Sequence, residues 1–210
     1  MIPLKKSVEP EVLTNNARNW TDELLRRLEA GDAPTEYLMS RYAHPEIKSA
    51  LLVETSEKCA YCESPFRHVT YGDVEHIAPK RANPQLRFSW DNLTVACDVC
   101  NTRKAEHELF DPYQADPMDA FFFMGPVMWP RPGDDRAAIT EARLDLNRLP
   151  LIQRRLERLE FLRNLLASAH GKPADVRDAI LDKARRECAP SQPFSACAKA
   201  TFDQIAAMVA

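Results

Sequence analysis

The chain has 210 residues, of which 45% are hydrophobic, so it can form one substantial domain or two small ones with an ordinary globular core. Its formal net charge of -3 excludes a general attraction to nucleic acid or anionic membrane, so contacts with a polyanion must come from local patches. The sequence contains neither an apolar run near the roughly 20 residues that cross a bilayer nor a secretory signal in MIPLKKSVEPEV, so we expect a cytoplasmic protein without a membrane partner.

The first part of the chain, residues 1–58, has the pattern of a helical region. Apolar residues recur at helical spacing between Val12 and Leu28, and Gly31 follows where a C-terminal cap would lie. A second helix is expected from Pro45, because proline is favoured in the first turn of a helix. That helix leads toward the first cysteine pair.

Residues 59–110 have a different pattern, rich in turns and in Cys, His, Asn and Pro. The β-branched and aromatic residues between Val69 and Ile77 favour short strands. A helix is expected from Asn101 to Glu108, directly after the second cysteine pair. The expected order of elements is therefore strand, strand, helix.

Residues 111–210 begin with two apolar runs, FFFM and VMW, which are bounded by turn residues and predict two short strands or an apolar hairpin. A stripe of leucines between Leu149 and Gly171 predicts a long helix. Pro173 and Pro193 predict the starts of two shorter helices. The whole chain is thus expected to be mainly α with a small β component.

Two C-x-x-C pairs, separated by 34 residues, form the most specific motif of the sequence: Cys59, Cys62, Cys97 and Cys100. Each pair can place two thiolates on one tight turn, and two such turns supply the tetrahedral four-sulfur set that zinc favours. Unpaired buried cysteines are the alternative, which the paired spacing disfavours. A closed four-sulfur site has no open position, so we expect a structural zinc ion that stabilises the fold.

The segment DVEHIAPK, residues 73–80, lies between the cysteine pairs and offers candidates for catalysis. Glu75 and His76 are adjacent in a strand-like stretch, so their side chains are expected on opposite faces. Histidine is the commonest general base near neutral pH. A lone histidine beside a carboxylate is nevertheless more often a surface or core residue, and the spacing alone leaves both interpretations open.

Together, these motifs resemble the zinc-stapled form of the HNH endonuclease family. The similarity rests on four segments: Cys59-x-x-Cys62, Glu75-His76-Ile77-x-Pro79-Lys80, Asn92-Leu93 and Cys97-x-x-Cys100-Asn101-x-x-Lys104. The resemblance implies a ββα-metal nuclease core at residues 59–110, stapled by the zinc site and embedded in flanking helices. It also implies that the chain hydrolyses DNA phosphodiester bonds.

The resemblance further implies roles for individual residues. His76 matches the general base that activates water, and Glu75 and Asn101 match the ligands of a catalytic divalent cation. Oxygen ligands of this kind suit magnesium or manganese. Asn92 matches an asparagine that braces the loop between strand and helix, although it can also be read as a simple turn residue. Many relatives carry Asp where this chain has Glu75, which has a longer side chain.

Several further residues have weaker interpretations. Lys80 and Lys104 are expected to contact phosphates. A role for His107 at the site competes with the default of an exposed helix position. Cys188 and Cys197 suit neither a zinc turn nor a redox pair, so we expect thiols outside the metal site. A solvated face is expected for the arginines of the long C-terminal helix: Arg154, Arg155, Arg158 and Arg163.

A longer and less specific similarity is to the HNH subunit of the Septu anti-phage system and its retron-linked relatives. It rests on MIPLKK, EKCAYCE, VEHIAPK, LFDPYQADPMDAFFF and ITEARLDLNRLPLIQRR. Such subunits act with a separate ABC or SMC-like ATPase, and this sequence contains no G-x-x-x-x-G-K-[ST] run of its own. The resemblance therefore implies two partners, DNA and an ATPase subunit.

Two other functions stay open. A non-catalytic zinc-stapled module that binds nucleic acid or protein would need the cysteines but neither His76 nor Asn101. A stand-alone HNH nuclease of the restriction or mobile-element kind would need no ATPase. The sequence does not distinguish DNA from RNA as substrate, or nicking from double-strand cleavage.

Overall fold

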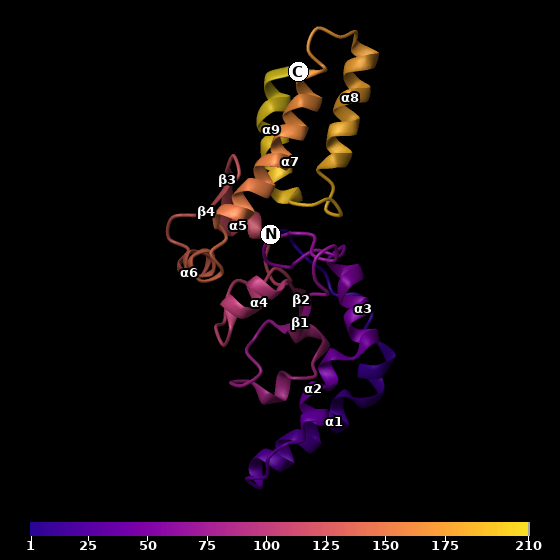
Figure 1. Ribbon diagram of the computed structural model, residues 1–210, viewed down its shortest axis with the longest axis vertical. Coiled ribbons are helices and arrows are strands. Elements are labelled where there is room, and N and C mark those ends of the chain that lie inside the picture. The colour runs from indigo at the N-terminus through magenta and orange to yellow at the C-terminus, as the bar shows by residue number, and fades with distance from the viewer. Residues whose placement is uncertain (210) are drawn as a thin grey trace. The chain divides into compact units, whose positions relative to one another are not determined.

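A computed structural model describes residues 1–209, and the side chains of residues 1–205. The chain divides into two compact units (Figure 1). The N-terminal unit comprises Leu4–Tyr61 and Pro65–Tyr113, and the C-terminal unit comprises Met1–Pro3, Cys62–Ser64 and Gln114–Ala210. Both are mainly helical and each contains one pair of short strands, which confirms the predicted fold class. The division expected from the sequence, at residues 58 and 110, stays a prediction.

The N-terminal unit begins with helices that the sequence largely predicted. They are α1 (Glu11–Glu29), α2 (Glu36–Ser40), the 3-10 helix η1 (Arg41–Ala43) and α3 (Pro45–Glu54). The apolar face of α1 buries Leu13, Trp20 and Leu24. The helix α3 starts at its proline, as expected, and ends at Glu54 because Ser56 and Glu57 adopt left-handed backbone conformations.

The predicted order of strand, strand and helix is confirmed by β1 (Asp73–His76), β2 (Leu93–Ala96) and α4 (Asp98–Lys104). The two strands pair antiparallel over their whole length, and α4 packs against β1 (Figure 1). Two short 3-10 helices, η2 (Pro84–Leu86) and η3 (Trp90–Asn92), lie in the connection between the strands. This arrangement is a ββα unit.

Two boundaries in this unit differ from the prediction. The second strand does not lie between Val69 and Ile77, where only β1 forms, but directly before the second cysteine pair. The helix starts at Asp98 rather than Asn101, because Cys97 in extended conformation already serves as its N-cap. It ends at Lys104 because Ala105 has a φ of 46°. The predicted metal ligand Asn101 therefore lies inside α4 and not at its first residue.

The C-terminal unit begins with α5 (Pro117–Ala120) and the predicted apolar hairpin, formed by β3 (Phe121–Met124) and β4 (Val127–Pro130). The following helix α6 (Asp135–Leu144) was not predicted. The side chain of Asp134 caps it by accepting a hydrogen bond from the amide of Ala137 at 2.8 Å. The available sequence signals were Asp134 as a capping residue and the helical spacing of Ala137, Thr140 and Leu144, which the structure buries.

The last three helices are α7 (Leu149–Ala167), α8 (Ala174–Glu187) and α9 (Ser195–Val209), as the leucine stripe and the prolines predicted. They pack side by side around a core that includes Leu162, Leu166 and Phe202 (Figure 1). The expectation that the arginines of α7 form a solvated face is wrong for Arg155. This side chain is buried and donates to the carbonyls of Pro126 at 3.1 Å and Leu146 at 2.9 Å.

Within the described residues, none of the helices has the length and the apolar character that a membrane span requires.

Candidate active site

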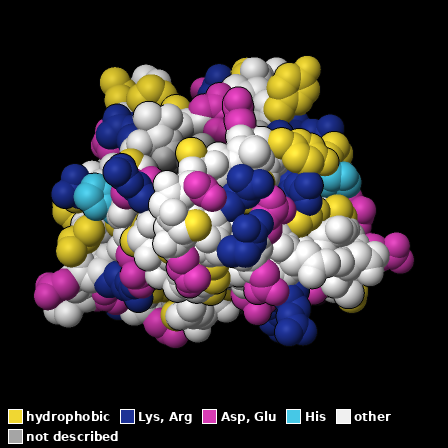
Figure 2. Space-filling view, turned by 90° about the horizontal axis from the view of Figure 1, so that it is seen from below, with side chains coloured by type: hydrophobic (Ala, Val, Ile, Leu, Met, Phe, Trp, Pro, Cys, Tyr) yellow, Lys and Arg dark blue, Asp and Glu magenta, His cyan; other side chains and the backbone are white. Residues whose placement is uncertain are grey.

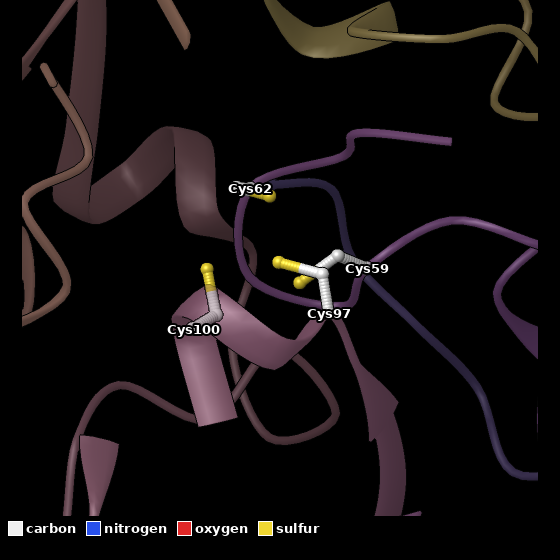
Figure 3. A group of neighbouring side chains, drawn as sticks. All are labelled: Cys59, Cys62, Cys97 and Cys100. Atoms are coloured by element: carbon white, nitrogen blue, oxygen red, sulfur yellow. The ribbon is translucent and has the colours of Figure 1, made fainter. Parts of the chain in front are cut away.

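The four predicted zinc ligands lie together. Their sulfur atoms are all within 4.8 Å of one another, and Figure 3 shows all four side chains converging on one point. In a tetrahedral site with zinc–sulfur bonds of about 2.3 Å, the sulfur atoms stand about 3.8 Å apart, so the cluster fits such an ion with small adjustments. Cys59 and Cys62 come from the turn after α3, whereas Cys97 and Cys100 come from the start of α4. The cluster can therefore hold a metal ion.

The backbone explains why the two cysteine turns meet. The amide of Ala60 donates to the carbonyl of Val95 in β2 at 3.0 Å, so the first turn is attached to the strand that leads into the second. All four cysteines are buried. A metal held by them would thus lie beside the strands and fix the start of α4.

Glu75 lies in β1 and forms a buried ion pair with α4. Its Oε1 is 2.9 Å from the Nζ of Lys104, and this ammonium also donates to the carbonyl of His76 at 2.7 Å. Burial raises the pKa of Glu75, and the charge of Lys104 opposes that shift and favours the carboxylate. Lys104 thus reduces the rise in the pKa of Glu75 that burial causes.

His76 is the last residue of β1, and its ring is held on two sides. The Nε2 atom lies 3.0 Å from the carbonyl of Arg87, which can only accept, so Nε2 carries the proton and Nδ1 keeps its lone pair in the neutral ring. The ring of Tyr42 packs edge-on against it with centroids 4.5 Å apart. Burial lowers the pKa of His76 to about 3. The imidazole is therefore neutral near pH 7, as a general base must be.

Asn101 points its amide nitrogen at a carboxylate. The Nδ2 atom donates to Oδ2 of Asp73 at 2.8 Å. Because a carboxylate can only accept, this bond assigns the orientation of the amide and directs the Oδ1 atom elsewhere. The oxygen is the atom that a hard divalent cation would use.

Asn92 braces the loop after β1. Its Oδ1 accepts from the amide of Ala78 at 2.7 Å, and its Nδ2 donates to the carbonyls of Ala78 at 3.1 Å and Leu86 at 3.2 Å. All three bonds go to backbone groups. The geometry agrees with a bracing part for Asn92 in the loop between the strands, and a catalytic role for this residue stays a prediction.

Glu75, His76 and Asn101 meet at one small cavity of about 170 Å³, which Lys80 also lines. A regular strand would direct Glu75 and His76 to opposite faces, but β1 ends at His76 and the two side chains share this cavity. Three residues that a sequence motif assigns to one reaction thus come together. A cavity of this size accommodates a small group such as a phosphate.

The two predicted phosphate contacts differ in position. Lys80 lines the cavity, and its Nζ donates to the hydroxyl of Tyr42 at 2.9 Å. Lys104 is only 1% exposed and uses its ammonium for Glu75 and the backbone of His76. A phosphate contact by Lys104 stays a prediction that would require the ammonium to leave these partners. His107 is not among the residues that line the cavity, although Ala105 and Glu106 are.

Three contributors to this site escaped the sequence analysis: Tyr42, Asp73 and the carbonyl of Arg87. Tyr42 comes from η1, far from the motif in sequence, and no local pattern connects it to His76. Asp73 had an available signal, since residues two apart on a strand share a face and Asp73 precedes Glu75 by two. The backbone carbonyl carries no sequence signal.

Charge is mixed on the face of the molecule drawn in Figure 2. There, Lys and Arg side chains alternate with Asp and Glu side chains and form no continuous basic surface. This distribution agrees with the formal net charge of -3. Lys80 is a cation at the cavity itself and can attract a phosphate locally.

Comparison with known proteins agrees with this geometry. Residues 59–107 match the family model described as HNH endonuclease. A protein named Septu protein PtuB from Bacillus thuringiensis is 36% identical over 109 residues, which are 51% of this chain and 38% of that protein. Another Septu protein PtuB, from Bacillus mycoides (strain KBAB4), is 30% identical over 122 residues, which are 48% of this chain and 40% of that protein.

The chain therefore spans about two fifths of the length of these curated relatives. The family match includes the whole ββα unit, both cysteine pairs and every motif residue of the cavity. Residues 59–107 of this chain are a domain of the HNH endonuclease family.

Proposed function

We propose that this protein is a metal-dependent endonuclease that hydrolyses DNA phosphodiester bonds at the cavity lined by Glu75, His76 and Asn101. The observation that carries the proposal is the convergence of a neutral imidazole, a buried carboxylate and an oriented amide on one cavity. The imidazole suits the role of general base, and the carboxylate and the amide oxygen suit the role of cation ligands.

In the proposed reaction, the Nδ1 atom of His76 takes a proton from a water molecule as the water oxygen attacks phosphorus. The bond between phosphorus and the 3'-oxygen breaks, and that oxygen leaves with the bonding electron pair. The Nε2–H···O bond to Arg87 holds the imidazole in the tautomer that this proton transfer requires. Lys80 binds a phosphate oxygen through its ammonium.

Two different metal sites follow from the donor atoms. Glu75 and Asn101 would hold magnesium or manganese, because both offer hard oxygen donors, and the ion pair with Lys104 occupies only one carboxylate oxygen of Glu75. When bound, such a cation supplies positive charge beside the phosphate and the leaving oxygen. Cys59, Cys62, Cys97 and Cys100 would hold a structural zinc ion.

Asp73 adds a positioning contact to this site. By accepting from the Nδ2 of Asn101, it keeps the Oδ1 of that amide available for the cation. Without Asp73, the amide could rotate and present a nitrogen that cannot bind a metal ion. Asp73 thus supports the assignment of Asn101 as a ligand.

The test is the substitution His76→Ala, with His68→Ala as a matched control, since His68 is exposed and lies in the same family-matched segment. Supercoiled plasmid is incubated with each variant and magnesium or manganese. We expect the His76 variant to lose about 10²- to 10⁴-fold in nicking rate, the usual contribution of general base catalysis. Its zinc content and circular dichroism should equal those of the wild-type protein. Nicking at the wild-type rate by the His76 variant would refute the assignment.

We also propose that the protein acts in anti-phage defence together with an ATPase subunit. The similarity to Septu proteins supports this setting. Co-purification from native cells, followed by identification of bound proteins and an ATPase assay, tests it. Recovery of the chain without an ATPase would instead favour a stand-alone nuclease of the restriction kind.

A further inference from the structure

We infer that Tyr42 is a positioning residue of the nuclease site, which orients both the general base and the phosphate-binding lysine. The inference rests on the proposed function, because it assigns Tyr42 a task in that reaction. Tyr42 lies in η1, outside the segment that matches the HNH family model. It therefore adds to the site a residue that the family motif does not contain.

The first contact is with the ring of His76. The centroids of the two rings are 4.5 Å apart, and their planes are inclined by 73°. This edge-to-face contact complements the hydrogen bond from His76 Nε2 to Arg87, which fixes one edge of the imidazole but leaves it free to swing about that bond. Tyr42 limits this swing and keeps the Nδ1 atom in one direction.

The second contact is with Lys80. The hydroxyl of Tyr42 accepts a hydrogen bond from Nζ of Lys80 at 2.9 Å, and the ammonium stands 4.6 Å from the centroid of the tyrosine ring. Lysine has a flexible four-carbon side chain, so its charge is well placed only when something holds it. Tyr42 holds the ammonium at the wall of the same cavity that His76 lines.

The position of Tyr42 is itself fixed through Arg87. The Nε and Nη2 atoms of this buried guanidinium both donate to the carbonyl of Met39, at 3.0 Å and 2.7 Å. Met39 lies in α2, which continues directly into η1. One residue, Arg87, thus holds the imidazole through its carbonyl and the segment before Tyr42 through its side chain. This arrangement couples the N-terminal helices to the catalytic histidine.

Two substitutions separate the two contacts. Tyr42→Phe keeps the ring and removes the hydroxyl, so Lys80 loses its acceptor while His76 keeps its neighbour. We expect KM for plasmid DNA to rise about 3- to 10-fold, with kcat within about 2-fold, because ground-state binding of phosphate is weakened. Tyr42→Leu also removes the ring, and we expect kcat to fall about 10- to 100-fold, because a small displacement of a catalytic group has effects of that size.

The assay uses the full chain with any subunit that co-purifies, and Tyr71→Leu serves as control, because Tyr71 is 87% exposed. The ring protons of His76, identified by their loss in His76→Gln, are followed by NMR. They should shift in Tyr42→Leu but not in Tyr71→Leu. Should Tyr42→Leu fail to fold, the separation of KM from kcat in Tyr42→Phe still tests the inference.

Different failures have different meanings. If the wild-type protein with its partner and metal cleaves no DNA, the proposed function and this inference both fail. If the wild-type protein cleaves and folded Tyr42→Leu has the same kcat and KM, only the inference fails. An equal loss of kcat in Tyr42→Phe and Tyr42→Leu would also overturn it, because the ring contact could then not be the cause.

Discussion

The two pairs of strands in this protein have the same size and opposite character. Both β1–β2 and β3–β4 are antiparallel and pair four residues with four. In β1–β2, both faces are largely buried and polar side chains are buried with them. In β3–β4, the buried side chains are apolar, whereas Met124 and Trp129 are exposed.

The difference shows that polar side chains are buried in β1–β2, where their burial has an energetic cost, and not in β3–β4. Removal of a carboxylate or an imidazole from water costs several kcal/mol unless partners compensate. Glu75 and His76 have such partners in Lys104 and the carbonyl of Arg87. In the hairpin, the polar contacts go to backbone groups: Asn147 binds the amide and the carbonyl of Met128 at 2.9 Å and 2.7 Å, and Cys197 Sγ donates to the carbonyl of Gly125 at 3.3 Å. The buried polar side chains thus distinguish the strands beside the proposed site from the hairpin.

The largest expected effect concerns the cysteine cluster, which should stabilise β1–β2 and not β3–β4. Cys100→Ser removes one thiolate, and structural zinc contributes on the order of 10 kcal/mol to the folding of small zinc domains. Hydrogen exchange measured by mass spectrometry should show loss of protection in β1, β2 and α4, while the hairpin keeps its protection. Cys188→Ser, in the core of the C-terminal helices, is the control. Equal loss of protection in both strand pairs would contradict the comparison.

A smaller effect is expected when the buried ion pair is broken. Lys104→Met leaves the carboxylate of Glu75 buried without its cation, and such a change costs about 3–5 kcal/mol in the free energy of unfolding. The double variant Glu75→Gln with Lys104→Met should recover part of this loss, because no charge is then buried. Chemical denaturation measures both, and Lys80→Met, at the cavity wall, should change stability little. If the Lys104→Met variant were as stable as wild type, the ion pair would not compensate the burial of Glu75.

In the hairpin, the side chains of the two strands should contribute to stability through apolar contact. Met128 is 0% exposed, so Met128→Ala should cost about 2–5 kcal/mol through lost burial and the cavity left behind. Trp129→Ala removes a larger side chain, but this residue is 48% exposed and pairs across the strands with Phe122, so we expect a loss below about 1 kcal/mol. Both are measured by urea denaturation. The reverse order of the two losses would mean that the exposed face of the hairpin is covered in solution.

An effect smaller than the loss expected for Met128→Ala is a dependence on alkaline pH that originates at the hairpin turn. Burial raises the pKa of Cys197 from 9.0 to about 12. The folded protein therefore binds more protons than the unfolded chain between these values, and the stability from this thiol is present below pH 9 and is lost as the pH rises. Between pH 8 and pH 10, wild type should lose about 1.4 kcal/mol more than Cys197→Ala in urea denaturation. Parallel pH profiles of the two proteins would show that Cys197 does not titrate in this way.

Much of the fold was predictable because its signals are local. The long helices α1, α7, α8 and α9 follow from apolar periodicity and from proline or glycine at their ends. The two apolar strands follow from their bounding turns. The helix α6 was missed because its signal is short, and the start of α4 was missed because a predicted zinc ligand, Cys97, also serves as its N-cap.

The sequence by itself determined which residues are available for chemistry. Cysteine spacing predicted a cluster that the structure brings together, and the motif named Glu75, His76, Asn92 and Asn101. The reason is that residue type and spacing within one turn or one strand are local properties of the chain. Tertiary structure alone decided the partners: Lys104 beside Glu75, Asp73 beside Asn101, and Tyr42 beside His76. Such contacts join different elements, and only their packing sets which side chains meet.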